Sequence, residues 1–264
     1  MKLAMLVLCH KNPEQINKFI DVLSSDNIDF FVHVDKKSSI SDRIRTRKNV
    51  FLIPDDKRIN VKWATFSQVQ AELNLINAAY YNNVYDYFWL VSGQDYPLAT
   101  PEKIIERLAI NPQIIYMNLS YSKNNGNTTN THLDKRHEIL FPDWILKKGF
   151  VHRIVRRLWV EFTGGYNHTY KIFKRHDTLQ YKYYYGSQWW CISRNFVEHI
   201  LSVLIDNPQL VESFNYSSCP DESFFQTILM NSDFKKYRMD YLHYIDWGRN
   251  NNSPRILTRR DLVH

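Results

Sequence analysis

The first half of the chain alternates short apolar runs with segments of helical periodicity, and this alternation constrains the fold more than any other feature. One helix is predicted from Pro13, whose ring suits the first helical position, and others over residues 65–81 and 101–109. Strands that alternate with helices build a mostly parallel sheet whose ligands bind beyond the carboxyl ends of the strands. We therefore predict an α/β protein, with strands at residues 3–9, 30–34, 50–53, 87–91 and 114–117.

The second half has a less regular pattern, but no linker separates it from the first. Because nothing divides the chain into independent cores, residues 1–264 are predicted to form one domain, with halves at 1–118 and 119–264. The elements predicted in the second half are an Asn- and Thr-rich loop, an aromatic strand, two helices and a turn-rich tail, at residues 119–135, 188–193, 195–204, 221–230 and 246–254.

The composition narrows the classes of function. The chain has 44% hydrophobic and 23% charged residues, as ordinary globular proteins do, and its seven glycines form neither of the Gly-rich loops that cradle phosphates. Three scattered cysteines exclude a disulfide framework and indicate reduced thiols, and no run approaches the ~20 apolar residues of a membrane span. We therefore expect a cytoplasmic protein. Its net charge of +7 suits an anionic ligand, a nucleic acid or an anionic membrane surface.

Residues 150–162 are predicted to form a basic amphipathic helix, with Arg153, Arg156 and Arg157 on one side. Such a helix can contact the inner face of a membrane or an anionic acceptor. It can equally pack its apolar side into the core and leave its basic side in water, and the sequence leaves both interpretations open. The apolar side consists of Phe150, Val151, Ile154, Val155, Leu158 and Phe162.

Two adjacent carboxylates, Asp221 and Glu222, follow Pro220 at the start of a predicted helix. The helix dipole favours negative charge there, so either residue could simply cap the helix. Capping needs only one carboxylate, and the other would then remain for work as a general base, which must be ionised to accept a proton.

Seven short segments, taken together, carry a resemblance to a known family. They are residues 10–13 (HKNP), 32–38 (VHVDKKS), 63–71 (WATFSQVQA), 90–98 (LVSGQDYPL), 186–190 (GSQWW), 220–222 (PDE) and 244–247 (YIDW). In this order and spacing they resemble the core 2/I-branching enzymes, glycosyltransferase family 14, which also contains the peptide O-xylosyltransferases. The resemblance extends over nearly the whole chain.

The resemblance implies a GT-A-type glycosyltransferase fold with a Rossmann-like sheet, and an inverting transfer from a UDP-sugar that forms a β linkage. The first half would bind the nucleotide sugar, and the second would bind the acceptor and carry the general base, which corresponds to Glu222. Asp35 would lie at the uridine, and Asp95 at the diphosphate and sugar. The implied donor-binding residues are His10, Asp35, Trp63, Ser67, Ser92, Gln94 and Asp95, and the implied acceptor-binding residues are Gln188, Trp189, Trp190, Asp221 and Trp247.

We expect no metal and no cofactor besides the UDP-sugar co-substrate. The chain contains no Asp-x-Asp, the usual metal-binding pair of GT-A enzymes, and the family implied is metal-independent, with basic side chains facing the diphosphate. The family's Arg-Lys-Phe segment does not occur before His264, so either the chain continues beyond this sequence or Arg249 and Arg255 take its role. A metal-dependent transferase, the alternative, would use His33 with Asp35 or Asp95 as ligands.

The expected reaction is transfer of GlcNAc to a glycan or glycolipid in bacterial surface polysaccharide synthesis, with xylose or another sugar as the alternative. The competing class is a non-catalytic module that binds glycan or nucleic acid, which the basic charge and the 15% aromatic content would suit. Nucleic-acid binders interleave basic and aromatic residues on one element. Here they lie on separate elements, so we expect no nucleic-acid partner.

Overall fold

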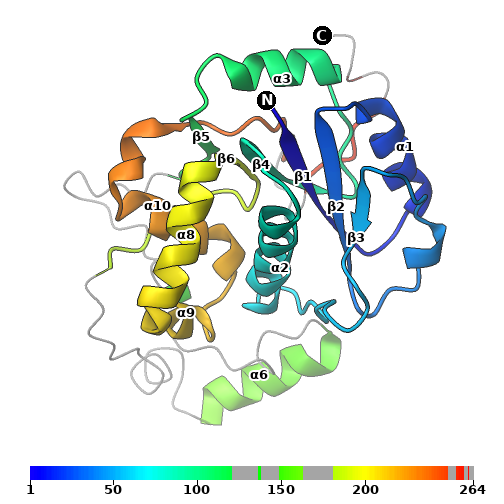
Figure 1. Cartoon of the computed structure of the whole chain (residues 1–264). Helices are drawn as coiled ribbons and strands as arrows, with labels where there is room; N and C mark the ends of the chain where they lie inside the picture. Colours follow the sequence, from blue (N-terminus) through cyan, green and yellow to red (C-terminus); the bar gives the residue numbers. More distant parts are fainter. Residues whose placement is uncertain (121–135, 138–148, 163–180, 249–253, 259–260, 262–264) are drawn as a thin grey trace.

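The computed structural model describes residues 1–120, 136–137, 149–162, 181–248, 254–258 and 261, and within them a seven-stranded sheet forms the centre of the molecule (Figure 1). The strands are β1 (Leu3–Cys9), β2 (Ile28–Val34), β3 (Val50–Leu52), β4 (Tyr87–Ser92), β5 (Ile115–Met117), β6 (Trp190–Ser193) and β7 (Arg238–Met239). Their order is β3-β2-β1-β4-β6-β5-β7. Only β6 runs antiparallel to its neighbours, β4 and β5, so the predicted α/β fold with a mostly parallel sheet is confirmed.

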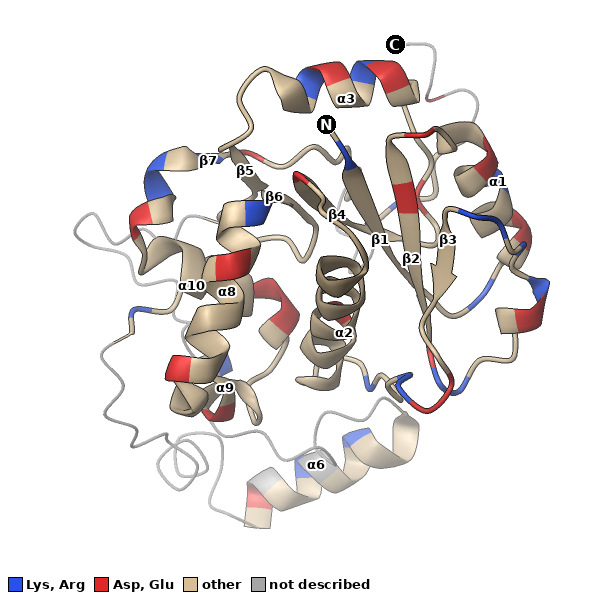
Figure 2. Ribbon diagram, in the orientation of Figure 1, with Lys and Arg blue, Asp and Glu red and all other residues tan. Residues whose placement is uncertain are grey.

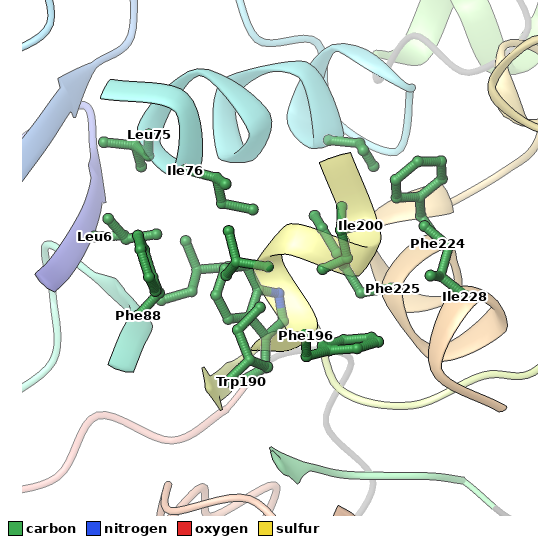
Figure 3. Packing of buried hydrophobic residues seen from close by; sticks show 14 of the residues in the cluster. Leu6, Leu75, Ile76, Phe88, Trp190, Phe196, Ile200, Phe224, Phe225 and Ile228 are labelled. Carbon is green, nitrogen blue, oxygen red and sulfur yellow. The ribbon is translucent and has the colours of Figure 1, made fainter. Parts of the chain in front are cut away.

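Helices cover both faces of the sheet, because its strands carry apolar side chains on both sides. α1 (Pro13–Leu23) and α3 (Pro101–Ala109) pack on one face. In Figure 3, Leu6 and Phe88 of the other face meet Ile76 from α2 and Phe196 from α8. The helices on that face are α2 (Ser67–Asn82), α8 (Arg194–Asp206), α9 (Pro208–Phe214) and α10 (Phe224–Met230). The remaining helical elements are α6 (Phe150–Phe162), η1 (Ser41–Arg43), η2 (Pro220–Glu222) and η3 (Asp233–Tyr237).

The elements of the first half lie where the pattern predicts them, with shifts of at most a few residues. The best match is α3, whose ends are set locally: Pro101 occupies the first position, and the Lys103 N–H donates to Thr100 Oγ1 at 3.5 Å. β2 begins earlier than predicted, at Ile28, and α2 begins later, at Ser67. In this half, local signals were sufficient.

The second half departs from the prediction in several places. The helix predicted over 221–230 is two elements, η2 and α10, because Ser223 between them has a φ of −146°. The aromatic strand begins at Trp190 rather than at residue 188, and α9, η3 and β7 were not predicted. Beyond residue 120, the Asn- and Thr-rich loop lies outside the described residues. The division into two functional halves stays a prediction.

The topology gathers several chain segments at one edge of the sheet. The carboxyl ends of β1, β2 and β4 meet there: the Asp35 N–H donates to the Cys9 carbonyl O at 2.8 Å, and the Gly93 N–H to the Leu8 carbonyl O at 2.8 Å. Because β6 is antiparallel to β4, the residues that precede β6 reach the same edge. We call the carboxyl ends of β1, β2 and β4, with Asp35 and residues 92–95, the strand-end edge. It is where ligands bind in open α/β sheets.

Candidate active site

Asp35 follows β2 directly and is nearly buried. One carboxylate oxygen, Oδ1, accepts from the Lys37 N–H at 2.9 Å, and the other lies 3.5 Å from Lys37 Nζ. The two contacts fix the carboxylate at the strand-end edge, where the resemblance implied a donor-binding group. His10, on the loop after β1, is exposed at the same edge, and its carbonyl O accepts from the Ser38 hydroxyl at 2.8 Å.

Residues 92–95 form a turn that closes on its own polar groups. The Ser92 N–H donates to Asp95 Oδ2 at 2.9 Å, and the Gln94 N–H donates to Ser92 Oγ at 3.2 Å. Burial raises the pKa of Asp95 to about 6, although the Ser92 N–H opposes that rise. The Gln94 side chain is exposed. Gly93 is required here, because a Cβ on it would lie 2.6 Å from the Cys9 Cβ.

His243 lies beside Asp95 and was missed by the sequence reasoning. Its Nε2 is 3.7 Å from Asp95 Oδ2, and its ring lies about 6 Å, between centroids, from Trp89, Trp189 and Tyr241. Burial lowers the pKa of His243 to about 4, so the imidazole is neutral near pH 7. Neither ring nitrogen has a hydrogen-bond partner among the described residues. The only sequence signal was its position next to the 244–247 segment.

Arg58 is a second residue that the sequence reasoning missed. Its side chain is only 10% exposed, its Nε lies 3.1 Å from Asp55 Oδ1, and within the described residues its Nη1 has no hydrogen-bond partner. The adjacent Ile59 donates its N–H to His33 Nε2 at 2.9 Å and accepts at its carbonyl O from the Lys36 N–H at 3.0 Å, which places Arg58 beside the end of β2. Arg58 is therefore a buried cation at the strand-end edge with hydrogen-bonding capacity left.

His33 does not suit the metal-ligand role that the alternative gave it. Its Nε2 accepts a hydrogen bond from the Ile59 N–H at 2.9 Å, so that lone pair is already used. Burial lowers the pKa of His33. No group of three His, Cys, Asp or Glu side chains arranged to hold a metal ion occurs in the part of the chain that the structure describes.

The Pro220–Glu222 segment lies on a strained turn, which we call the acid turn. Cys219, just before it, has a φ of +52°, and its N–H donates at 3.0 Å to the carbonyl O of Ala64, whose φ is +61°. Left-handed backbone costs a non-glycine residue ~1 kcal/mol or more and concentrates at functional sites. Ser67 helps to build the turn around Ala64, since its Oγ accepts from the Lys62 N–H at 2.8 Å.

Glu222 presents its carboxylate at the surface of this turn, where its side chain is 38% exposed. Its Oε2 accepts a hydrogen bond from Arg136 Nη1, in an ion pair that the sequence gave no means to predict. The Gly186 N–H donates to the Glu222 carbonyl O at 2.8 Å. A Cβ on Gly186 would lie 1.9 Å from the Asn118 carbonyl O, so only glycine fits between the sheet and the acid turn.

Asp221 is buried next to Glu222 and does not behave as predicted. Neither η2 nor α10 has a side-chain cap, which contradicts the capping role. Burial, and then the charge of Glu222, raise the pKa of Asp221 to about 7, the opposite of a carboxylate kept ionised by a helix dipole. Its Oδ1 has no hydrogen-bond partner among the described residues.

Glu72, on α2, is a further buried carboxyl group beside Asp221. Its Oε1 accepts from Gln188 Nε2 at 2.8 Å, so Gln188 links this group to the residues before β6. Burial, and then Asp221, raise the pKa of Glu72 well above its usual range. The sequence did contain a signal: Glu72 lies three residues after Val69 and four before Ile76, on the apolar side of the helix.

The implied aromatic binding residues separate into two groups. Trp190 is completely buried in the core against Phe225, with ring centroids 5.1 Å apart, so it cannot stack on a sugar, and that expectation is wrong (Figure 3). Trp63 and Trp247 are more than half exposed, and Trp189 is partly buried beside His243. These three keep a surface that a ligand ring can reach.

Arg255 is partly exposed, and two carboxylates already pair with its guanidinium. Its guanidinium lies 2.8 Å from Asp246 and 2.7 Å from Asp261, so the role expected for it stays a prediction that requires these two ion pairs to open for the donor. Arg249, the other residue expected there, lies outside the described residues, as do Arg259 and Arg260.

Comparison with known proteins shows the family to which the chain belongs. A family model described as Core-2/I-Branching enzyme matches residues 3–264. Similar curated proteins are xylosyltransferase 2 of Canis lupus familiaris and of Homo sapiens, 26% and 25% identical over 93% of this chain, and human xylosyltransferase 1, 23% identical over 94%. The chain spans about a quarter of the length of these relatives. Because the family model covers nearly the whole chain, the chain belongs to the core-2/I-branching enzyme family, glycosyltransferase family 14.

Proposed function

We propose that this chain is an inverting glycosyltransferase that moves a sugar from a UDP-sugar to a hydroxyl group of a glycan or glycolipid, forming a β linkage. The observation that supports this most directly is the partly exposed carboxylate of Glu222, held by Arg136 on a strained turn beside the strand-end edge. Inversion in one step needs one base on the face of the sugar opposite the leaving group.

In this mechanism Glu222 accepts the proton of the acceptor hydroxyl. The acceptor oxygen then forms a bond to the anomeric carbon, while the bond from that carbon to the β-phosphate oxygen breaks and UDP leaves with the electron pair. Arg136 engages Oε2 of Glu222 and orients the carboxylate, and within the described residues Oε1 has no partner and is left for the acceptor. Asp221, which the resemblance implied as an acceptor-binding residue, is buried next to the base, as is Glu72, so we propose that the two support the base rather than contact the acceptor.

The departing diphosphate needs positive charge, and Arg58 is the described cation that we propose for it in place of Arg255. Its guanidinium is nearly buried at the strand-end edge and retains an unused N–H donor group at Nη1. A charge-assisted hydrogen bond from such a group is stronger than one formed in water. Asp35 and the turn over 92–95 would contact the uridine and the sugar.

The transferred sugar is GlcNAc or xylose in this proposal. The family resemblance implied GlcNAc first, whereas the curated relatives are named xylosyltransferases. Both donors therefore belong in the first assay. Because Asp-x-Asp is missing from the sequence and the Nε2 lone pair of His33 is used, we propose that transfer proceeds without a metal ion.

The test is a UDP-release assay over a panel of sugar nucleotides, together with thermal-shift titration of UDP, ADP and GDP. UDP is expected to raise the unfolding temperature more than ADP or GDP does, because a ligand that binds only the folded state stabilises it by mass action. Release of UDP from UDP-GlcNAc or UDP-xylose is expected to continue in EDTA. Equal shifts for the three nucleotides would exclude the uridine site, and glycan binding without UDP release would favour a non-catalytic module.

A further inference from the structure

α6 exposes apolar side chains that most helices bury. Phe150, Ile154, Leu158 and Phe162 follow one another at intervals of four residues and form one row, which Val151 and Val155 widen. All six are exposed, from 42% at Val155 to 89% at Phe162, so the core-packed interpretation of this helix is wrong. An exposed apolar row of this length indicates a surface that binds a partner or a membrane.

The charges of α6 border this apolar row. Arg153 and Arg157 are spaced by four residues, lie next to the Phe150 row and are exposed. Figure 2 shows basic positions along α6 and an acidic position near one of its ends. Glu161 is the only acidic residue of the helix. Trp159, which is partly buried, lies beyond the other border. Apolar residues flanked by arginine on one side and tryptophan on the other are typical of helices that lie in the interface of an anionic bilayer.

The position of α6 relates this surface to the candidate active site. In Figure 1, α6 lies on the side of the molecule toward which β1 and β3 run, which is the side of the strand-end edge. α3 lies at the opposite end. A membrane in contact with α6 would therefore be on the same side as the groups proposed to hold the donor. No helix in the described part of the chain is long and apolar enough to cross a bilayer.

We propose that α6 is a peripheral docking surface for an anionic lipid bilayer, and that the acceptor sugar is carried by a lipid in that bilayer. The apolar row would insert between the lipid acyl chains near the headgroups, and Arg153 and Arg157 would pair with headgroup phosphates. Docking by this surface brings the strand-end edge and the acid turn toward lipid-borne glycans. The membrane docking is inferred from the exposed residues of α6 alone, whereas the lipid-borne acceptor rests on the proposed function.

Sedimentation with lipid vesicles tests the docking without any donor or acceptor. The whole chain is expected to bind vesicles of phosphatidylglycerol and phosphatidylcholine, and to bind pure phosphatidylcholine far less. Arg153→Glu with Arg157→Glu is expected to weaken binding to the anionic vesicles about tenfold or more, because each basic group near such a surface contributes to attraction. Phe162→Ser is expected to weaken binding as well. Phe162 is almost fully exposed, so its loss should leave the fold unchanged.

The matched control is Lys103→Glu with Arg107→Glu on α3. It makes the same change in net charge on exposed residues at the opposite end of the molecule, and vesicle binding is expected to change little. If the control weakens binding as much as the α6 variant, the attraction is a property of total charge and the docking surface is wrong.

Two further outcomes would overturn the proposal. One is failure of the unmodified chain to bind anionic vesicles. The other is concentration-dependent dimerisation, seen by analytical ultracentrifugation and removed by Phe162→Ser, without vesicle binding, which would make α6 an interface between copies. Transfer to a soluble glycan is measured separately. If the α6 variants still transfer sugar to the soluble glycan but no longer transfer it to a glycolipid in vesicles, both the docking surface and the lipid-borne acceptor are supported. If the α6 variants transfer sugar equally well to the soluble glycan and to the glycolipid in vesicles, the lipid-borne acceptor is contradicted.

Discussion

The strand-end edge and the acid turn each contain a carboxyl group whose pKa is raised, but the two regions surround it differently. Burial raises the pKa of Asp95 at the edge to about 6 and that of Asp221 in the turn to about 7. Beside Asp95 lies a neutral imidazole, His243, at 3.7 Å. Beside Asp221 lie two further carboxyl groups, Glu72 and Glu222, and the second of these is paired with Arg136.

The difference indicates which carboxyl group suits which task. A general base needs a lone pair that substrate can reach and a partner that holds it in place. Glu222 has both, because it is partly exposed and hydrogen-bonded to Arg136. Asp95 is instead partly exposed, and the nearly buried His243 beside it has neither ring nitrogen hydrogen-bonded to the described residues, as expected of a group that holds a ligand. The acid turn is suited to chemistry and the edge to binding.

The largest expected effect comes from Glu222→Gln, which tests this assignment directly. Glutamine keeps the shape of the side chain but cannot take a proton, so kcat in the UDP-release assay should fall about 10²–10⁴-fold. UDP binding, measured by thermal shift, should persist because the donor is proposed to bind at the strand-end edge. Added Mn²⁺ should not restore activity.

The neighbouring Asp221→Asn is the matched control for this experiment. Asp221 is buried and proposed to make no contact with the acceptor, so the variant should keep kcat within about tenfold of the unmodified chain. A fully active Glu222→Gln, or a loss of turnover confined to Asp221→Asn, would move the base to Asp221 and reverse the comparison between the two acids of the turn.

The sequence predicts a region well where neighbouring residues determine its structure, and poorly where contacts between distant residues do. The strands and helices of the edge are set by periodicity and capping within a few residues, as in α3, and they were predicted closely. Asp35 and the 92–95 turn could be located because the carboxyl ends of parallel strands share one edge. His243 and Arg58 reach that edge only through the tertiary fold, and no spacing in the sequence indicates it.

The acid turn was less predictable because long-range contacts shape it. Ser223 interrupts the expected helix while its hydroxyl donates to the Tyr184 carbonyl O at 2.7 Å, 39 residues away. Arg136 and Glu222 are 86 residues apart in sequence. The sequence also could not predict which of two adjacent side chains, Trp189 or Trp190, is buried. Neighbouring residues of a strand point to opposite faces of the sheet, and only the structure shows that Trp190 is the one that faces the core. Among the groups discussed around the acid turn, only Glu72 has a local signal in the sequence, because it is a charged residue on the apolar side of a helix.

The next effect is on stability and tests the buried acids. A carboxyl whose pKa is raised in the folded state stabilises the fold fully below its unfolded pKa, and that contribution is lost as the pH rises through the folded value. For Asp221 the window runs from about pH 4 to about pH 7, and Glu72, whose pKa is also raised, adds to it. Asp221→Asn should therefore flatten the decrease in the free energy of unfolding between pH 5 and pH 8, by up to a few kcal/mol.

Urea unfolding at pH 5 and pH 8 measures this difference. The control is Asp26→Asn, since Asp26 is exposed and its variant should follow the unmodified chain at both pH values. Parallel curves for Asp221→Asn and the unmodified chain would show that Asp221 is not a buried protonated acid, and the contrast with Glu222 would then lose its physical basis.

The smallest expected effect is on UDP affinity. It tests Arg58, which we propose as the counter-charge for the diphosphate, against Arg255, which the sequence led us to expect in that role. Arg58 is nearly buried with an unused donor at the strand-end edge, whereas Arg255 is held between Asp246 and Asp261. Arg58→Met should weaken UDP binding about tenfold, the lower end of what one hydrogen bond to a charged group contributes, and Arg255→Gln should change it little. Arg58→Lys keeps the charge without the planar fork, so intermediate binding is expected.

Isothermal titration with UDP measures the affinity of all three variants, and circular dichroism checks that each variant folds. If Arg58→Met folds and binds UDP normally while Arg255→Gln does not, the ion pairs of Arg255 must open for the donor, and the counter-charge belongs to the tail rather than to the sheet.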